Sequence, residues 1–304
     1  MKHIFWIIQA AIFYTLTLIA AYIPYSIAFR LGAQLGFIIP LIIPKRRKIV
    51  IDNINASLAY MKAHQLWNSP CKDAGGLARA IFMNMGRSLI EICKLYHGRG
   101  EAIIKGIQIR GLENYEAART KGKGIIFLSG HCGNWELMSL TLSSLFGKEL
   151  SGIVRSQNNP YFNKMVERMR SRYNSRLIYK KGAMKAILAA LKKKEMVGIM
   201  ADQAVFPNEG YLIDVLGRKA WAAKAPVIIA RKSGAALVPV FIYREGEQHI
   251  ITFYPEHVLD SDTDEAGIKK DTEALSRYVE DFIVAHPTQW YWVHRRWKRA
   301  ESAS

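Results

Sequence analysis

The longest uninterrupted apolar pattern in the chain lies near its N-terminus. Residues 4–29 read "IFWIIQAAIFYTLTLIAAYIPYSIAF" and contain no charged residue. Because a helix rises about 1.5 Å per residue, roughly 20 residues cross a hydrocarbon layer about 30 Å thick. A buried core helix or a cleaved signal would also be apolar, but a signal has an apolar region of about 7–15 residues and a small-x-small cleavage site. The pattern therefore favours one membrane-spanning helix.

A second apolar stretch follows at residues 31–44, "LGAQLGFIIPLIIP". Glycine and proline interrupt it, so we expect a re-entrant or interfacial helix and not a second span. The basic run "KRRK" at residues 45–48 comes directly afterwards. Positive residues beside a span mark its cytoplasmic side. We therefore expect an N-terminal anchor with an interfacial segment (residues 1–48) and a cytoplasmic domain (residues 49–304).

The rest of the chain alternates between two periodicities. Residues 75–97 carry apolar positions at steps of three and four, which predicts an amphipathic helix. The expected strands beyond it are residues 124–130, 151–155, 196–201, 211–215, 236–243 and 249–254. The expected helices are residues 134–147, 160–175, 183–194, 221–233 and 267–285. This alternation predicts an α/β domain with a largely parallel sheet covered by helices, and the hairpin-like last strand makes the sheet mixed.

Composition narrows the class of partner. The 304 residues include 43 Lys and Arg against 25 Asp and Glu, a net charge of +18, which indicates an anionic partner. An anchored protein already lies against anionic lipid, and the chain lacks any zinc-finger, helix-turn-helix or RNP signature, so we expect membrane lipid and no nucleic acid. The cysteines, Cys71, Cys93 and Cys132, form no CxxC pair, which argues against a disulfide framework and a structural zinc site.

The polar residues in "LSGHCGNWEL" (128–137) are the first candidates for chemistry. His131 lies where a strand is expected to end, and catalytic groups of α/β proteins gather there. Asn134 is a good helix N-cap, and Glu136 falls in the first helical turn, where the dipole favours a carboxylate. If the turn folds back, Glu136 accepts a hydrogen bond from the imidazole. We interpret the pair as a general base with its supporting carboxylate, acting on an alcohol or amine, with backbone N–H groups available for an oxyanion.

Other interpretations of this segment remain open from spacing alone. His131 also fits a buried structural histidine beside a helix cap. The neighbouring Cys132 invites the role of a thiol nucleophile. Its side chain should point away from that of His131, and no second histidine occurs nearby, which disfavours that role.

Several segments in order resemble a known family. They are "GHCGNWE", "GIVRSQNNPYFNKMVERMRSRYNSRLIYKKGAMKAIL", "GIMADQAVFPNEGYLIDVLGRKA", "GAALVPVFIYR" and "HPTQWYWVHRRWK". An H-x4-D/E motif after a strand is similar to that of the glycerolipid acyltransferase superfamily. The chain more closely resembles the bacterial lipid A late (secondary) acyltransferases, which carry glutamate where the glycerol-3-phosphate enzymes carry aspartate. The resemblance implies a fold like that of glycerol-3-phosphate acyltransferase.

The resemblance also implies a mechanism and further site residues. In the family, the histidine deprotonates the acceptor hydroxyl, which attacks an acyl thioester, and the glutamate supports the histidine without a metal or cofactor. Arg168 matches a family arginine in or near the site, although on spacing alone it belongs to a solvated helix face. Asp202 and Gln203 match the family's "DQ", where Asp202 would hold an arginine or line the acceptor pocket. Apart from the resemblance, Arg155 and Asn158 lie at the end of another expected strand, and from this position we expect them to contact phosphate or the acyl donor.

The C-terminal segment "QWYWVHRRWK" interleaves three tryptophans with basic side chains. This pattern is typical of a single-strand nucleic-acid platform or of an aromatic belt at a membrane interface. Because an anchor is expected, we interpret the segment as an interface belt, with core packing of Trp290 and Trp292 as the alternative. In the family context its basic residues could also face an acidic acyl carrier protein.

Together these patterns predict an O-acyltransferase of the bacterial inner membrane, single-pass, with its domain on the cytoplasmic side. It would move a fatty acyl chain from acyl carrier protein, or from acyl-CoA, to a lipid A precursor. Another acceptor keeps the same mechanism: a lysophospholipid, a phosphatidylinositol mannoside or an aminolipid. A non-catalytic, membrane-tethered binding protein is the alternative from a different class.

Overall fold

The computed structural model describes residues 2–69 and 71–301. Within them, a seven-stranded sheet has the order β1-β9-β8-β2-β5-β3-β4. Neighbouring strands are parallel except β8 and β9, which form an antiparallel hairpin, so the predicted mixed sheet is confirmed. The strands are β1 (Gln108–Arg110), β2 (Ile125–Ser129), β3 (Leu150–Val154), β4 (Arg176–Tyr179), β5 (Met196–Met200), β8 (Ala236–Glu245) and β9 (Gln248–Phe253).

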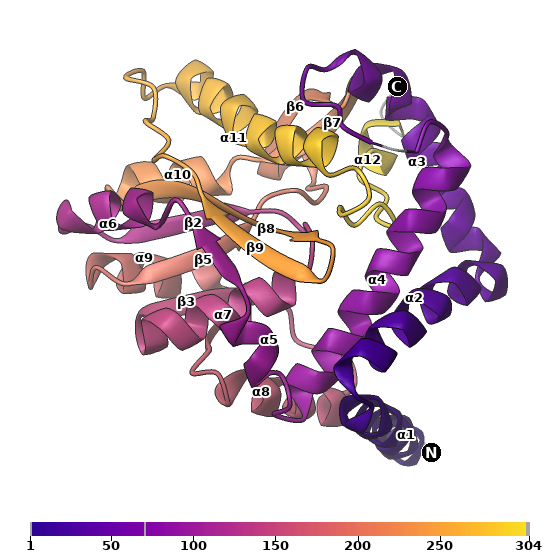
Figure 1. The fold of residues 1–304 in the computed structure, drawn as a ribbon. Helices are drawn as coiled ribbons and strands as arrows, with labels where there is room; N and C mark the ends of the chain where they lie inside the picture. The colour runs from indigo at the N-terminus through magenta and orange to yellow at the C-terminus, as the bar shows by residue number, and fades with distance from the viewer. Residues whose placement is uncertain (1, 70, 302–304) are drawn as a thin grey trace.

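Helices cover both faces of this sheet (Figure 1). Those after the N-terminal region are α4 (Ala74–Tyr96), α5 (Glu101–Lys105), α6 (Leu112–Thr120), α7 (Trp135–Phe146), α8 (Pro160–Ser171), α9 (Ala183–Lys192), α10 (Ala225–Ser233), α11 (Glu265–Ala285) and α12 (Lys298–Glu301). Successive residues of β2 alternate between two cores. Ile125 and Phe127 pack with α6 and α7, whereas Ile126 and Leu128 pack with α9 and α10. This alternation buries the whole strand.

A separate hairpin departs from the predicted pattern. β6 (Gly210–Val215) does not join the main sheet but pairs antiparallel with β7 (Arg218–Ala223). The expected helix start at residue 221 is wrong, because the chain stays extended through Ala223 and α10 begins at Ala225. Pro226, in the first turn of α10, is the residue type that favours a helix start. The three- and four-residue strands β1 and β4 were too short to be predicted from their pattern.

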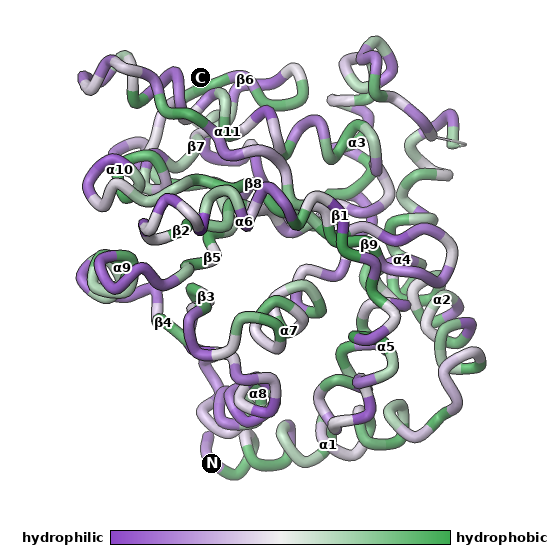
Figure 2. The backbone as a smooth tube through the Cα atoms, turned by 60° about the vertical axis from the view of Figure 1, so that its left-hand side comes forward, coloured by the Kyte–Doolittle hydropathy of each residue, from purple (hydrophilic) through white to green (hydrophobic). Residues whose placement is uncertain are grey.

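The N-terminal region contains two apolar helices where one long span was expected. α1 (Lys2–Tyr22) ends before Pro24, and α2 (Tyr25–Ile42) takes in most of the stretch predicted as interfacial. Among the described residues, these are the helices long and apolar enough to cross a membrane. α3 (Pro44–Ala63) follows directly and contains the basic run. The apolar character of α1 and α2 is visible along the backbone in Figure 2.

α2 packs closely on α4 through glycines. A Cβ atom on Gly86 would lie 2.0 Å from the carbonyl oxygen of Gly32, and one on Gly36 would lie 2.1 Å from that of Phe82. Only glycine permits such an approach of two backbones. The helix that carries the apolar N-terminal surface is therefore tightly joined to the helix that runs beside the sheet. Exposed apolar side chains remain on the outer faces of α1 and α2: Ile4, Phe5, Ile8, Ile12, Leu16, Ile19, Ile27, Leu31, Leu35, Ile38, Leu41 and Ile42.

Candidate active site

His131 and Asp202 follow two neighbouring parallel strands at matching positions. β2 pairs with β5 so that Ser129 lies opposite Met200. The Ala201 amide N–H donates to the Ser129 carbonyl at 2.9 Å, which continues the pairing by one residue. His131 and Asp202 each lie two residues beyond their strand, so the sheet register itself brings them together.

The imidazole of His131 is held by Asp202. Its Nδ1 lies 2.8 Å from Oδ1, and the His131 backbone N–H donates to Oδ2 at 2.9 Å. The indole Nε1 of Trp290 donates to the same Oδ2 at 2.8 Å. An ionised carboxylate only accepts hydrogen bonds, so Nδ1 carries the proton and Nε2 is the free acceptor. The Gln203 amide nitrogen lies 3.2 Å from Nε2.

Electrostatics favour an ionised Asp202 and a basic His131. Burial by itself raises the pKa of Asp202, but the His131 charge and the hydrogen bonds from His131 and Trp290 lower that pKa to about 2. Burial lowers the pKa of His131, whereas the Asp202 carboxylate beside it raises that pKa by more, so it lies above its ordinary value. The pair therefore has the charge distribution of a general base with an orienting anion.

The predicted contact between His131 and Glu136 is wrong. Glu136 lies in the first turn of α7, as expected, but its carboxylate points toward α8. There it accepts two hydrogen bonds from Arg170, from Nε at 2.7 Å and from Nη2 at 2.8 Å. Burial lowers the pKa of Arg170, but the Glu136 carboxylate raises it by more. The bidentate pair holds the Glu136 carboxylate against Arg170, and the carboxylate that holds the histidine is that of Asp202.

One cavity of about 240 Å³ brings these groups together. It lies between α7 and the strands β2, β3 and β5, and its lining includes His131, Glu136 and Arg170. Deeper lining residues are largely apolar, among them Phe127, Met138, Leu142, Leu150 and Val240. We call this space the histidine cavity. A polar, charged end beside an apolar interior is suited to a ligand with a reactive head and a hydrocarbon tail.

The other expected site residues are distributed unevenly. Arg155 lines the histidine cavity, and Gln203 contacts the imidazole. Asn158 is exposed and lies outside the lining residues. Arg168 is also exposed on α8, and the arginine of that helix that lines the cavity is Arg170, two positions further along.

The turn that carries His131 is fixed by its own geometry and by the C-terminal segment. Gly133 has φ 53°, and a Cβ atom there would lie 2.2 Å from the Ile242 carbonyl oxygen, so glycine is required. The Gly133 N–H donates to the Gln289 carbonyl at 2.6 Å, and the Tyr291 N–H donates to the His131 carbonyl at 3.1 Å. The Cys132 side chain is buried, which raises its pKa well above the ordinary value and does not favour a thiolate nucleophile.

The C-terminal tryptophans are part of the core, so their interpretation as an interface belt is wrong. Trp290, Trp292 and Trp297 are 3%, 0% and 1% exposed. Sequence reasoning missed the contact of Trp290 with Asp202, because a pattern of local spacing carries no signal for residues 88 positions apart. Among residues 2–69 and 71–301, no three His, Cys, Asp or Glu side chains are grouped to hold a metal ion.

Comparisons of the sequence with a family model and with curated proteins agree on one family. The model of the bacterial lipid A biosynthesis acyltransferase family matches residues 2–299. The lipid A biosynthesis lauroyltransferase of Escherichia coli is 25% identical over 91% of this chain and 87% of its own. The lipid A biosynthesis acyltransferase of Haemophilus influenzae is 23% identical over 96% of this chain and 88% of its own. A solved structure, the 1-acyl-sn-glycerophosphate (LPA) acyltransferase PlsC from Thermotoga maritima, aligns with a TM-score of 0.39 and 14% identity over 85% of this chain and 97% of that one.

Proposed function

The chain belongs to the bacterial lipid A biosynthesis acyltransferase family, and we propose that it transfers a fatty acyl chain from a thioester to a hydroxyl group of a lipid A precursor, with His131 as general base. One observation carries this assignment of the base. The Nδ1 of His131 is fixed by the buried Asp202, while the ring lines a cavity that has a charged end and an apolar interior.

The chemistry proceeds in two steps. His131 Nε2 takes the proton of the acceptor hydroxyl while the oxygen attacks the thioester carbonyl, which forms a tetrahedral oxyanion. The oxyanion collapses, the new ester forms, and the carbon–sulfur bond breaks. The departing sulfur takes the proton from the imidazolium and leaves as a thiol. Asp202 stabilises the imidazolium between these steps, as the carboxylate of a catalytic triad does.

Glu136 and Arg170 take a different part in this proposal. Glu136 acts through Arg170, because the two make a bidentate ion pair that lines the histidine cavity. The Arg170 guanidinium is thereby fixed in place, with donors in a planar fork suited to an oxyanion or to a phosphate on the donor. In this proposal Glu136 supports the reaction indirectly, because it positions the Arg170 guanidinium.

The donor proposed is acyl carrier protein, with acyl-CoA as the smaller anionic alternative. From Arg155 to Lys194, basic side chains dominate and only Glu167 is acidic. This segment begins at the rim of the histidine cavity, where Arg155 and Gln157 are lining residues. A basic surface beside the reactive groups attracts and orients an acidic carrier. The transferred chain is proposed to be a fatty acyl group of the kind named in the relatives, which include lauroyl and palmitoleoyl transferases.

The site of action proposed is the cytoplasmic side of the bacterial inner membrane. α1 and α2 present apolar side chains outward, and the basic run 45–48 follows α2 directly. Apolar faces enter lipid, while Lys and Arg beside them bind anionic headgroups. The lipid acceptor then reaches the protein from the same layer.

Replacing His131 tests the proposed reaction. In His131→Ala, turnover falls about 10²- to 10⁴-fold, because the proton acceptor is lost while binding and folding persist. The measurement is transfer of labelled acyl chains from purified acyl carrier protein or acyl-CoA, with His64→Ala as the matched control. Unchanged turnover in His131→Ala would remove the histidine from the mechanism.

The acceptor is tested in cells. Mass spectrometry of total lipids with and without the gene product should show lipid A that lacks one acyl chain when the protein is absent. Unchanged lipid A with an altered glycerolipid or aminolipid profile would keep the chemistry and replace the acceptor.

A further inference from the structure

A second cavity, also of about 240 Å³, adjoins the histidine cavity. Trp135 lines both, so its indole ring is a shared wall between them. The ring is held at the junction by two edge-to-face contacts, with its centroid 5.1 Å from that of His131 and 5.4 Å from that of Tyr291. We call this second space the α4 cavity. Any chain bound there would end close to the proposed base.

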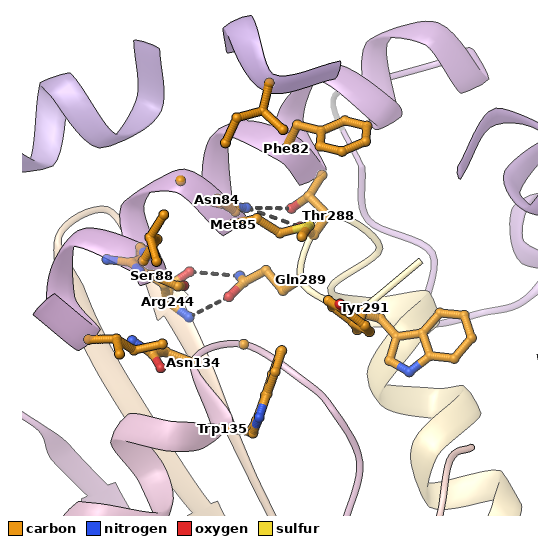
Figure 3. Close-up of a pocket in the computed structure, with 16 residues that line it drawn as sticks. Phe82, Asn84, Met85, Ser88, Asn134, Trp135, Arg244, Thr288, Gln289 and Tyr291 are labelled. Carbon is orange, nitrogen blue, oxygen red and sulfur yellow. Dashed lines mark hydrogen bonds between the residues drawn. The ribbon is translucent and has the colours of Figure 1, made fainter. Parts of the chain in front are cut away.

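The lining of the α4 cavity is mainly apolar. Phe82, Met85, Leu89 and Ile92 of α4 contribute one face of that helix, at steps of three and four residues. Figure 3 shows Phe82 and Met85 on this side of the cavity and Trp135 and Tyr291 across from them. The polar side chains in this lining, among them Asn84, Asn134, Arg244 and Gln289, are hydrogen-bonded to other groups of the protein. The residues His131, Glu136 and Arg170 belong to the histidine cavity. The α4 cavity therefore fits a hydrocarbon chain, whereas the histidine cavity fits a chain with a reactive polar head.

The position of the α4 cavity points to the lipid side. Ile39, which lines it, belongs to α2, one of the two apolar helices long enough to cross a membrane. Leu89, also in the lining, is 39% exposed, so the cavity reaches the surface there. The neighbouring α2 residues Leu35 and Ile38 are exposed as well. The apolar outer surface of α2 thus continues into the α4 cavity. The basic segment that begins at Arg155 borders the histidine cavity instead.

We propose that the α4 cavity binds a hydrocarbon chain of the lipid acceptor, and that the histidine cavity receives the chain of the thioester donor. The inference rests on the proposed acyl transfer, in which two lipid-like chains must meet at one base. Trp135 keeps the two chains apart, so that each substrate is selected by its own pocket. Without this wall, an acceptor chain would compete for the space of the donor chain.

Filling each cavity separately tests this division. Leu89→Trp narrows the α4 cavity at its partly exposed edge, and Ser139→Leu narrows the histidine cavity. Leu145→Trp is the matched control, since Leu145 is 53% exposed and lines neither cavity. The full chain is assayed in lipid nanodiscs with acceptors that differ in hydrocarbon length and with acyl donors of graded chain length. Thermal unfolding verifies that each variant is folded.

In Leu89→Trp, the KM for the acceptor rises about tenfold while the preferred donor length stays that of the wild type, as expected for overpacking of one pocket. In Ser139→Leu, the preferred donor becomes shorter and the acceptor KM stays within about twofold. If Leu89→Trp fails to fold, Leu89→Phe is expected to raise the KM for the acceptor by a smaller factor. A changed donor preference in the Leu89 variants, or an unchanged acceptor KM, would overturn the assignment. A wild-type protein that transfers no acyl chain would instead refute the proposed function.

Discussion

Two buried carboxylates are arranged alike and surrounded differently. The Asp202 side chain is 3% exposed and that of Glu91 is 0% exposed, and each accepts hydrogen bonds from a histidine and from several other donors. The partner of Asp202, His131, has a side chain that is 20% exposed and lines a cavity. Two of the side chains that donate to Glu91, those of Arg244 and His249, are 5% and 2% exposed. One carboxylate orients an imidazole that lines a cavity, and the other is enclosed.

Glu91 of α4 joins five elements. It accepts hydrogen bonds from Tyr25 at the start of α2, from Asn134 at the N-cap of α7, from Arg244 in β8 and from His249 in β9. Burial alone would raise the pKa of Glu91, but the bonds and charges of His249 and Arg244 hold it well below its ordinary value. The cluster links an apolar N-terminal helix to the helix that follows His131. Its role is to stabilise the arrangement of those helices.

The comparison teaches that a buried anion beside a histidine does not mark a catalytic site by itself. Both sites contain the pair, and each carboxylate accepts at least three hydrogen bonds. What differs is the free nitrogen of the imidazole. In His131 it faces a cavity and the Gln203 amide, whereas His249 is buried on all sides. The two sites therefore differ in access to the imidazole, and this access is the reason that His131 is the proposed base.

Removing the enclosed carboxylate has the largest expected effect. Glu91→Ala leaves Arg244 as a buried charge without its anion, which lowers the free energy of unfolding by about 3–5 kcal/mol. Denaturant unfolding of the detergent-solubilised protein measures this loss of unfolding free energy. The lowered pKa of Glu91 means that its stabilisation is present above the ordinary carboxyl pKa and is lost as the pH falls through the folded value.

Glu116→Ala is the control for this loss of stability, because it removes an exposed carboxylate from a helix and leaves the Glu91 cluster intact. A Glu91→Ala protein as stable as the wild type would contradict the structural role assigned to that residue. The Glu91 and Asp202 sites would then differ less in their contribution to stability than their burial indicates.

Neutralising the other carboxylate acts on the reaction. In Asp202→Asn, the rate falls on the order of 10²-fold, because the imidazolium loses its stabilising anion. Two N–H donors face Oδ2, so the amide oxygen takes that place and the amide NH2 faces Nδ1, which favours the wrong tautomer. The Asp202 charge raises the pKa of His131, and burial lowers it, so removing that charge shifts the pH–rate midpoint downward. The base acts when deprotonated, so the rate rises with pH through this midpoint in both proteins. A midpoint that does not move would show that another group titrates.

The smallest change removes one hydrogen bond from Asp202. Trp290→Phe keeps the buried ring but loses the indole donor, which lowers the free energy of unfolding by about 1–2 kcal/mol and the rate by about tenfold or less. Trp292→Phe is a matched control, since its indole donates to the Pro287 carbonyl instead. Both variants should lose similar stability, and only Trp290→Phe should change the pH–rate profile. If both variants changed the pH–rate profile equally, the Trp290 hydrogen bond would have no specific role at the site.

The sequence by itself predicted most of the elements and the position of the proposed base. The apolar pattern predicted six of the strands and most helices, because a buried strand is a short continuous apolar run, whereas an amphipathic helix repeats its apolar residues every three or four positions. It also placed His131 at the end of β2 and Asp202 at the end of β5. The local rule for a helix start correctly put Glu136 in the first turn of α7, since a cap acts within a few residues.

Only the tertiary structure decided which carboxylate holds the base. The register of β2 and β5 aligns His131 with Asp202 across 71 positions, and the packing of α8 turns Glu136 toward Arg170. The burial of Trp290, the Glu91 cluster and the wall formed by Trp135 likewise depend on segments far apart in the chain. Local patterns report how a segment folds, whereas the partner of a side chain depends on which segments the whole fold places beside it.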